Sequence, residues 1–298
     1  MEIYSSGKVL LTGEYVILDG ALSLASPTKF GQYLKFKENL SNLINWKSIN
    51  YDGKIWFECS IKNENLQVKS TSSKKVSDTL IRIIKLIRKY NPYFLKNSGS
   101  DISSNLTFDK NWGLGSSSTL ISNLASLSGV DPYLLNNKIF KGSGYDIACA
   151  NSISPIVYRL NKGQNIINEV SFKPPFHEKI YFIYLNKKQS SISEVENYKN
   201  NKVSESVINE ISNITSMILQ CKSIEAYDKL IESHELIISN LISKPTIKES
   251  LFKDFNGSIK SLGAWGGDMI MATSRSNPNN YFIEKGYSTI FKFEELLV

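Results

Sequence analysis

The feature that most constrains this chain is a glycine-rich stretch between a predicted strand and a predicted helix. The stretch reads Asn111-Trp112-Gly113-Leu114-Gly115-Ser116-Ser117-Ser118-Thr119. Residues 101–109 before it have the apolar spacing of a strand, and the residues after it have helical spacing, with Leu120, Ile121, Leu124 and Leu127 on one face. Its hydroxyl residues are predicted to cap the helix, because serine and threonine are good N-caps. The order is therefore strand, glycine loop, helix.

This order suits a phosphate cradle, because glycine lets the backbone approach an anion closely. The start of the helix adds unpaired N–H groups and the positive end of its dipole. A Gly-x-Gly pattern before a helix is also typical of an ordinary tight turn, so the stretch alone leaves both interpretations open.

The overall composition is that of an ordinary folded protein. The 298 residues suggest one large domain or about two smaller ones, and 41% apolar with 21% charged residues is ordinary for a globular chain. The net charge of +7 comes from scattered lysines without a long basic run. We therefore expect no nucleic-acid partner, and the charge suits either a solvated surface or an anionic small molecule.

The cysteines and the apolar runs indicate a cytoplasmic protein. Cys59, Cys149 and Cys221 are too far apart for a metal motif or a disulfide framework. The first residues do not have a signal-peptide pattern, and no apolar run approaches the ~20 residues of a membrane span. Only two histidines are present, and His234, in a helical pattern, is expected at the surface or the core edge. Two histidines are few for a histidine-based catalytic triad or a zinc site, so neither is expected.

The spacing of apolar residues predicts an α+β protein, because strands and helices mix without strict alternation. Residues 2–12 are expected to form two short strands hinged at Ser6-Gly7, and residues 16–18 another strand. Residues 39–47 and 63–75 are polar and are expected to be loops. Three helical patterns follow in series after residue 205. The prolines near residue 174 suggest a boundary between domains 1–172 and 173–298.

Three further loops carry chemistry-bearing residues. The first loop is Gly7-Lys8 with Gly13-Glu14-Tyr15, the aspartate loop is Gly142-Ser143-Gly144-Tyr145-Asp146, and the third loop is Gly263-Ala264-Trp265-Gly266-Gly267-Asp268. We name Gly113–Ser118 the second loop. Considered singly, Lys8 and Glu14 could be surface residues, and Asp146 could only cap a helix.

Together the first, second and third loops resemble the three motifs of the GHMP kinases. This family includes galactokinase, homoserine kinase, mevalonate kinase and phosphomevalonate kinase. The aspartate loop is similar to the catalytic-aspartate loop of that family. Its Gly-Ser-Gly-aromatic-Asp form and Asp268 are closest to the phosphomevalonate kinase branch. The resemblance spans essentially the whole chain.

The resemblance implies a two-lobed fold. The N-terminal lobe would be like ribosomal protein S5 domain 2, the C-terminal lobe would be ferredoxin-like, and ATP would lie between them. It implies Asp146 and Lys8 as catalytic residues, Ser117 at Mg²⁺, and Glu14, Tyr15 and Ser191 facing the substrate. The ATP-binding residues implied are Gly113, Leu114, Gly115, Ser116, Ser117, Ser118, Gly263, Gly266 and Gly267.

Three departures from the family pattern stand out. The proline ahead of the second loop is missing, and Trp265 replaces a glycine of the third loop, where a positive φ would strain a tryptophan. The interval 121–143 holds Asp131 as its one acid, where mevalonate kinases place a magnesium-binding glutamate. Mg²⁺ is often coordinated mainly by waters and substrate phosphates instead.

The sequence therefore predicts an ATP-dependent kinase for mevalonate or 5-phosphomevalonate in isoprenoid precursor biosynthesis, acting as a monomer or homodimer. A carboxylate, a lysine and an N–H-rich loop suffice for phosphoryl transfer. The chain lacks the Walker A motif and the His-Arg-Asp catalytic loop of other kinase classes. Two alternatives stay open: a GHMP kinase for another alcohol such as a sugar, and an inactive paralogue that binds a ligand, a protein or RNA.

Overall fold

The chain folds into two compact units, each built from separate segments. The computed structural model describes residues 1–161, 164–189, 194, 198 and 203–298. The first unit comprises Met1–Gly7, Phe30–Lys110 and Leu114–Asn151, and the second comprises Lys8–Lys29, Asn111–Gly113 and Ser152–Val298. The boundary after residue 172 stays a prediction.

The first unit is built on a twisted mixed sheet. Its strands are the first part of β1 (Glu2–Leu10), the later part of β2 (Ser23–Asn39), β3 (Leu43–Ile49), β4 (Ile55–Lys62), β5 (Val68–Thr71) and β6 (Gly99–Leu106). The order is β5-β4-β3-β6-β2, and β1 also pairs with β2. β3 is parallel to β6, whereas β2–β6, β3–β4 and β4–β5 are antiparallel.

Three expectations about these strands are wrong. Residues 2–10 form one strand without a hinge at Gly7. Residues 39–47 contain the start of β3, where Ile44 and Trp46 are buried on alternate positions between polar neighbours. Residues 63–75 contain β5, in which Val68 is apolar and half-buried and the other three residues are polar and exposed; pairing with β4 creates this edge strand. In both segments tertiary pairing overrides a polar sequence.

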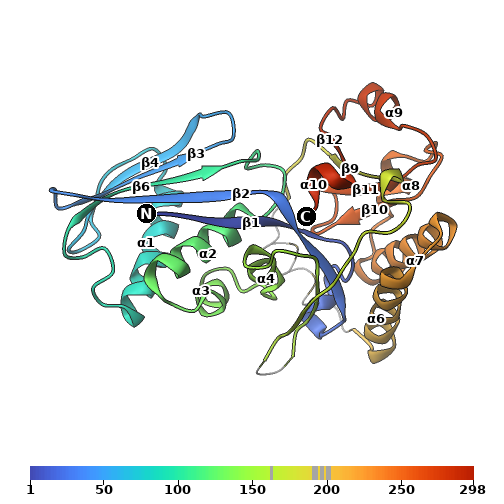
Figure 1. Cartoon of the computed structure of the whole chain (residues 1–298), viewed down its shortest axis with the longest axis horizontal. Helices are drawn as coiled ribbons and strands as arrows, with labels where there is room; N and C mark the ends of the chain where they lie inside the picture. The colour runs from blue at the N-terminus through green and yellow to red at the C-terminus, as the bar shows by residue number, and fades with distance from the viewer. Residues whose placement is uncertain (162–163, 190–193, 195–197, 199–202) are drawn as a thin grey trace. The chain divides into compact units, whose positions relative to one another are not determined.

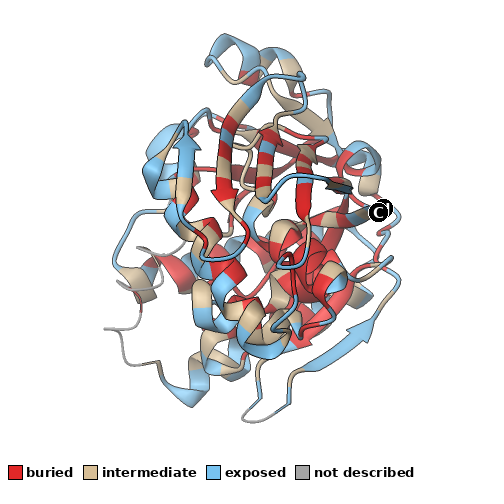
Figure 2. Cartoon of the chain, turned by 90° about the vertical axis from the view of Figure 1, so that its left-hand side faces the viewer, coloured by how far each residue is buried: buried red, intermediate tan, exposed pale blue. Residues whose placement is uncertain are grey.

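Four helices lie on one side of this sheet (Figure 1), namely α1 (Lys74–Tyr90), α2 (Ser116–Ser128), α3 (Pro132–Ile139) and α4 (Tyr145–Ala150). Apolar residues recur at helical spacing from Val76 to Tyr90 and are followed by Asn91-Pro92, a pattern that predicts a helix ending there; the structure confirms this helix as α1. Its apolar face packs with α2 against strand residues such as Trp46 and Phe57 to form the core of the unit. Buried and more exposed positions alternate along the strands (Figure 2), because only the helix side of the sheet is covered.

The second unit is built on an antiparallel sheet of order β10-β11-β9-β12. Its strands are β9 (Ile180–Tyr184), β10 (Ile259–Leu262), β11 (Met269–Thr273) and β12 (Ile290–Lys292). In the same unit the first residues of β2 pair with β7 (Ile156–Arg159), which pairs with β8 (Ile166–Glu169). The third loop connects β10 to β11, so its position is set by a tight antiparallel pair.

The three predicted helices of this unit are confirmed as α6 (Glu205–Gln220), α7 (Ile224–Ile242) and α8 (Ile247–Leu251). Short helices complete the unit, namely η1 (Val16–Asp19), η2 (His177–Lys179), α9 (Asn279–Glu284) and α10 (Phe293–Leu296). The strand expected at residues 16–18 is wrong. The backbone has positive φ at Gly13, Tyr15 and Gly20, and these bends leave room for one helical turn, whose buried Val16 packs near α6 and α7.

Candidate active site

Residues of the first, second and third loops meet in the second unit. Lys8, on β1, donates a hydrogen bond from Nζ to the carbonyl oxygen of Gly113 at 2.9 Å. Gly113 lies directly against Asp268: a Cβ added to this glycine would be 2.6 Å from the Asp268 Cγ atom. The structure thus gathers a lysine, a glycine turn and a carboxylate that lie more than 100 residues apart in sequence.

Asp268 is held firmly at this point. Its backbone N–H donates to the carbonyl of Lys187 at 2.6 Å, and its Oδ1 accepts from the backbone N–H of Gln189 at 3.1 Å. Burial raises the pKa of Asp268, while the backbone N–H of Gln189 and the positive charges of Lys8 and Lys188 act in the opposite direction. Its φ of 52°, unusual for a non-glycine residue, agrees with a tightly determined position.

We expect Gly113→Ala to destabilise the chain more than a comparable change elsewhere. Gly113 has a φ of 74° and no room for a Cβ, whereas Gly129 has a φ of 68° and nothing within 4 Å of an added Cβ. Both alanines face the left-handed penalty of roughly 1–2 kcal/mol, but only Gly113→Ala adds a clash. Thermal denaturation of both variants measures the difference, and equal losses would contradict the close contact with Asp268.

Trp265 fits the third loop without strain, because the positive φ angles fall on Gly263, Gly266 and Asp268 rather than on Trp265. Its side chain is buried, and its backbone N–H donates to the hydroxyl of Tyr15 at 3.0 Å. Burial raises the pKa of Tyr15 well above its ordinary value. The concern that a tryptophan here strains the loop is therefore wrong, and Trp265 instead ties the third loop to the first.

The remaining third-loop glycine, Gly267, is close to the segment after β9. An added Cβ would be 2.5 Å from the side chain of Gln189 and 2.6 Å from the carbonyl of Lys187. Gln189 also donates from Nε2 to the carbonyl of Trp265 at 3.1 Å. The neighbouring Ser191, predicted to face the substrate, lies outside the described residues.

Glu14 has an unexpected environment. It is 1% exposed, and its carboxylate pairs with the equally buried Lys260 rather than facing solvent. The structure therefore does not support direct contact of this carboxylate with a substrate. Sequence reasoning missed Lys260, although a lysine three residues before Gly263, between the apolar residues of a short strand, was a usable signal.

The rest of the second loop belongs to the first unit. Gly115, with a φ of 90°, is the N-cap residue of α2 and provides no side-chain cap. The expectation that hydroxyls cap this helix is wrong: Ser118 Oγ donates back to the Gly115 carbonyl at 2.9 Å, and Thr119 Oγ1 donates to Gln32 at 2.9 Å. Leu114 is buried, Ser116 is half-buried and Ser117 is exposed. The turn therefore leaves Ser117 open to solvent.

Asp146 also belongs to the first unit. The left-handed Gly144 precedes α4, and Asp146 lies in the first turn, where its Oδ1 accepts from the N–H of Ile147 at 3.1 Å. Ser122 of α2 donates to Asn151 at 2.8 Å at the end of α4, which links the two helices. Asp146 is half-buried, so its carboxylate is held by short-range contacts without being sealed in the core.

Within the described residues, no group of three or more histidine, cysteine, aspartate or glutamate side chains is placed to hold a metal ion. In the same part of the chain no helix is both long and apolar enough to cross a membrane.

Comparison with known proteins identifies the fold. No family model and no curated protein matches the sequence. Among solved structures, Streptococcus pneumoniae phosphomevalonate kinase, in complex with phosphomevalonate and AMPPNP, is similar with a TM-score of 0.72 at 16% identity, covering 98% of this chain and 99% of that one. The chain has the fold of the GHMP kinases.

Two other kinases are similar over nearly the whole chain. Methanococcus jannaschii mevalonate kinase has a TM-score of 0.69 at 17% identity, covering 98% of this chain and 96% of its own. Lactococcus lactis galactokinase, in complex with galactose, has a TM-score of 0.65 at 12% identity, covering 100% of this chain and 93% of its own. The predicted fold class is thereby confirmed.

Proposed function

We propose that this chain is an ATP-dependent small-molecule kinase that transfers the γ-phosphoryl group to an alcohol. The observation that carries the proposal is the meeting of Lys8, Gly113 and Asp268 in the second unit. Phosphoryl transfer needs positioned charge and an N–H-rich cradle rather than a covalent nucleophile, and these residue types supply both. The GHMP kinase fold supports the same reaction class.

We assign roles to the predicted residues as follows. Asp146 accepts or orients the proton of the acceptor hydroxyl, and Lys8 steadies the negative charge that develops during transfer. The second loop holds the phosphates of ATP through backbone N–H groups at the start of α2. We also assign an ATP-binding role to Gly263, Gly266 and Gly267 of the third loop. Mg²⁺ bound to the phosphates neutralises their charge, and the exposed hydroxyl of Ser117 is the side chain available to hold it.

For the acceptor we propose mevalonate or 5-phosphomevalonate, as in the isoprenoid precursor route. The names of two similar structures and the Gly144-Tyr145-Asp146 form of the aspartate loop support this choice. The similarity to a galactokinase keeps a sugar as the second candidate. We further propose that the enzyme works in a reducing cytoplasm, which agrees with its three free cysteines. We also propose that it acts as a monomer or homodimer.

A coupled ADP-release assay with mevalonate, 5-phosphomevalonate and galactose tests the proposal. We expect turnover with one of the first two that depends on both MgATP and acceptor. Turnover with galactose alone would favour the sugar kinase. Stabilisation of the fold by MgATP without turnover of any acceptor would favour the inactive paralogue, because a bound ligand raises the melting temperature by mass action.

We expect Ser117→Ala to change the magnesium dependence of turnover while leaving stability within about 0.5 kcal/mol of wild type, as for other exposed positions. The Ser117 side chain is exposed, and α2 begins without a side-chain cap, so its loss should not weaken the helix. A magnesium titration of activity, with thermal denaturation alongside, measures both effects. An unchanged magnesium dependence would remove Ser117 from the metal site.

A further inference from the structure

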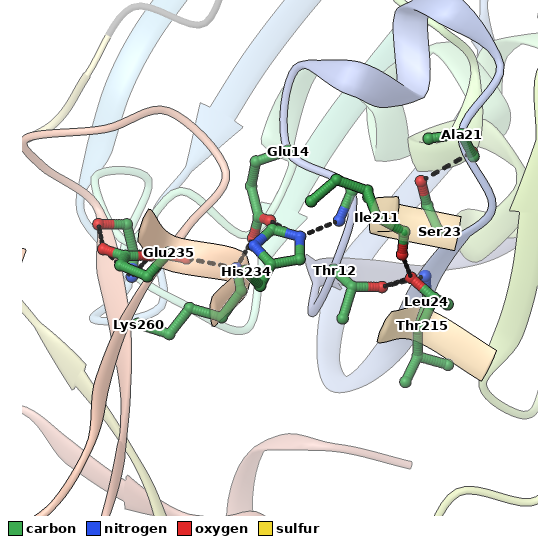
Figure 3. Close-up of polar contacts among 12 residues, drawn as sticks. Thr12, Glu14, Ala21, Ser23, Leu24, Ile211, Thr215, His234, Glu235 and Lys260 are labelled. Carbon is green, nitrogen blue, oxygen red and sulfur yellow. Dashed lines mark hydrogen bonds and ion pairs between the residues drawn. The ribbon is translucent and has the colours of Figure 1, made fainter. Parts of the chain in front are cut away.

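A cluster of buried ionisable side chains in the second unit contacts both the first loop and the strand before the third loop (Figure 3). It consists of Glu14, His234, Glu235 and Lys260, all at most 2% exposed, and we call it the buried network. Glu14 comes from the first loop, His234 and Glu235 from α7, and Lys260 from β10. Charged groups are rarely buried this completely unless they are paired.

Lys260 supplies the positive charge around which the buried network is arranged. Its Nζ atom donates to Glu14 Oε1 at 2.5 Å and to the carbonyl of Ser261 at 2.9 Å. Glu235 accepts from the N–H of Ser261 at 3.0–3.1 Å and from its hydroxyl at 2.8 Å. Burial raises the pKa of Glu235 to about 7, with the charge of Lys260 and the hydrogen bonds from Ser261 opposing it. These contacts fasten α7 and the first loop to β10.

His234 fastens the first loop at a second point. The backbone N–H of Gly13 donates to its Nε2 atom at 2.8 Å. Because Nε2 must offer a lone pair, the ring is neutral and carries its proton on Nδ1. Burial and the charge of Lys260 keep the pKa of His234 well below its ordinary value, which agrees with this form. The expectation that His234 is a surface or core-edge residue is therefore wrong.

Gly13 is closely packed and leaves no room for a side chain. Its φ is 90°, and an added Cβ would be 1.9 Å from the hydroxyl of Ser23. On the other side of the turn, Thr12 Oγ1 accepts from the N–H of Leu24 at 2.9 Å and is 2.8 Å from the hydroxyl of Thr215 on α6 (Figure 3). The turn is thus packed against β2 and anchored to α6 and α7.

We infer that His234 and Lys260 are positioning residues that fix the first loop onto the strand leading into the third loop. Lys8 precedes this turn on β1, and Gly263 follows Lys260 by three positions, so the buried network sets the geometry of both loops within the second unit. Glu14 acts as the partner of Lys260 rather than as a substrate contact. The inference rests on the proposed kinase function for its catalytic consequence, but not for its structural one.

The test compares variants at His234 with a matched control at Thr273. His234→Leu removes the acceptor of the Gly13 N–H, whereas His234→Gln retains an acceptor at the end of its side chain. Thr273 accepts a buried N–H from Ser258 at 3.2 Å, at the end of the β10–β11 pair away from the third loop. Thr273→Val therefore removes the same kind of interaction without touching the first loop, and it also removes the hydrogen bond that Thr273 donates to Asp228 at 2.5 Å. The control variant thus loses at least as many hydrogen bonds as His234→Leu.

We expect amide hydrogen exchange in residues 11–18 to accelerate roughly 10- to 100-fold in His234→Leu, the scale of one unsatisfied buried N–H. It should stay within about threefold of wild type in His234→Gln and Thr273→Val, a difference well below that scale. With the acceptor found by the ADP-release screen, kcat should fall about 10-fold or more only in His234→Leu, because misplaced loops impair the chemistry. His234→Asn, whose amide is shorter, replaces the leucine variant if that variant does not fold.

Unchanged protection of residues 11–18 in His234→Leu, or equal acceleration in Thr273→Val, would overturn the inference. So would accelerated exchange with wild-type kcat, since the loop would then be loose without consequence. If the wild-type chain turns over none of the acceptors, the proposed function fails. The exchange contrast still decides whether His234 holds the first loop.

Discussion

The Asp146→Asn variant should fold and bind MgATP, but turn over its acceptor on the order of 10² times more slowly than wild type or worse, the scale of a lost general base. The side chain sits in the first turn of α4 and accepts the N–H of Ile147. Asparagine can accept the same hydrogen bond, so local structure should persist while the basic carboxylate is lost. Steady-state kinetics with the acceptor identified by screening measures the effect, and melting temperature with MgATP verifies the fold.

Asp131→Asn is the matched control in the same unit. Asp131 is the N-cap residue of α3, where its Oδ1 accepts the N–H of Tyr133 at 2.8 Å. Asparagine is about as good a cap, so this variant should keep both stability and turnover. Turnover within a few-fold of wild type for Asp146→Asn would mean that Asp146, like Asp131, only caps a helix.

Lys8→Met extends this test to the second catalytic assignment. Its Nζ atom contacts the Gly113 carbonyl, so the variant removes a positive charge at the second loop. If Lys8 and Asp146 act as a unit, the double variant should lose less activity than the product of the single losses, because interdependent catalytic residues are not additive. Fully multiplicative losses would indicate that the two residues act independently.

Lys260→Met should cost about 3–5 kcal/mol of unfolding free energy, the range found when one member of a buried ion pair is removed. The variant leaves the carboxylate of Glu14 buried without its counter-charge. Adding Glu14→Gln should restore part of the loss, because a neutral pair no longer carries an uncompensated charge. Chemical denaturation of the single and double variants measures this coupling.

The loss should also depend on pH. Burial raises the pKa of Glu14 above its ordinary value of 4.5, and Lys260 opposes that rise. Without Lys260 the folded-state pKa rises further, so the folded protein binds a proton more tightly and loses stability as pH increases. The penalty of Lys260→Met should therefore shrink from pH 8 towards pH 5. Lys248→Met is the control, since Lys248 donates to the Gly257 carbonyl and should show a smaller loss with little pH dependence.

Strong local patterns were enough to predict several elements of the fold. The apolar spacing of residues 76–90 predicts α1, and glycine followed by a helical pattern predicts the turn before α2. The order of the glycine loops resembles the motifs of the GHMP kinases, and the fold is predicted from that resemblance rather than from residue spacing alone. Local pattern did not reveal β5 or η1, whose conformations depend on pairing with β4 and on bends at Gly13 and Tyr15.

Long-range contacts in the fold establish which loop residues work together and which are internal. Glu14 looks like a substrate ligand in the sequence, but the fold buries it beside Lys260, 246 residues away. His234 has no neighbouring signal, because its role depends on the N–H of Gly13, 221 residues away. Buried charges and backbone donors must find partners wherever the fold brings them. Those long-range pairings distinguish the residues that position the first loop from those that face solvent.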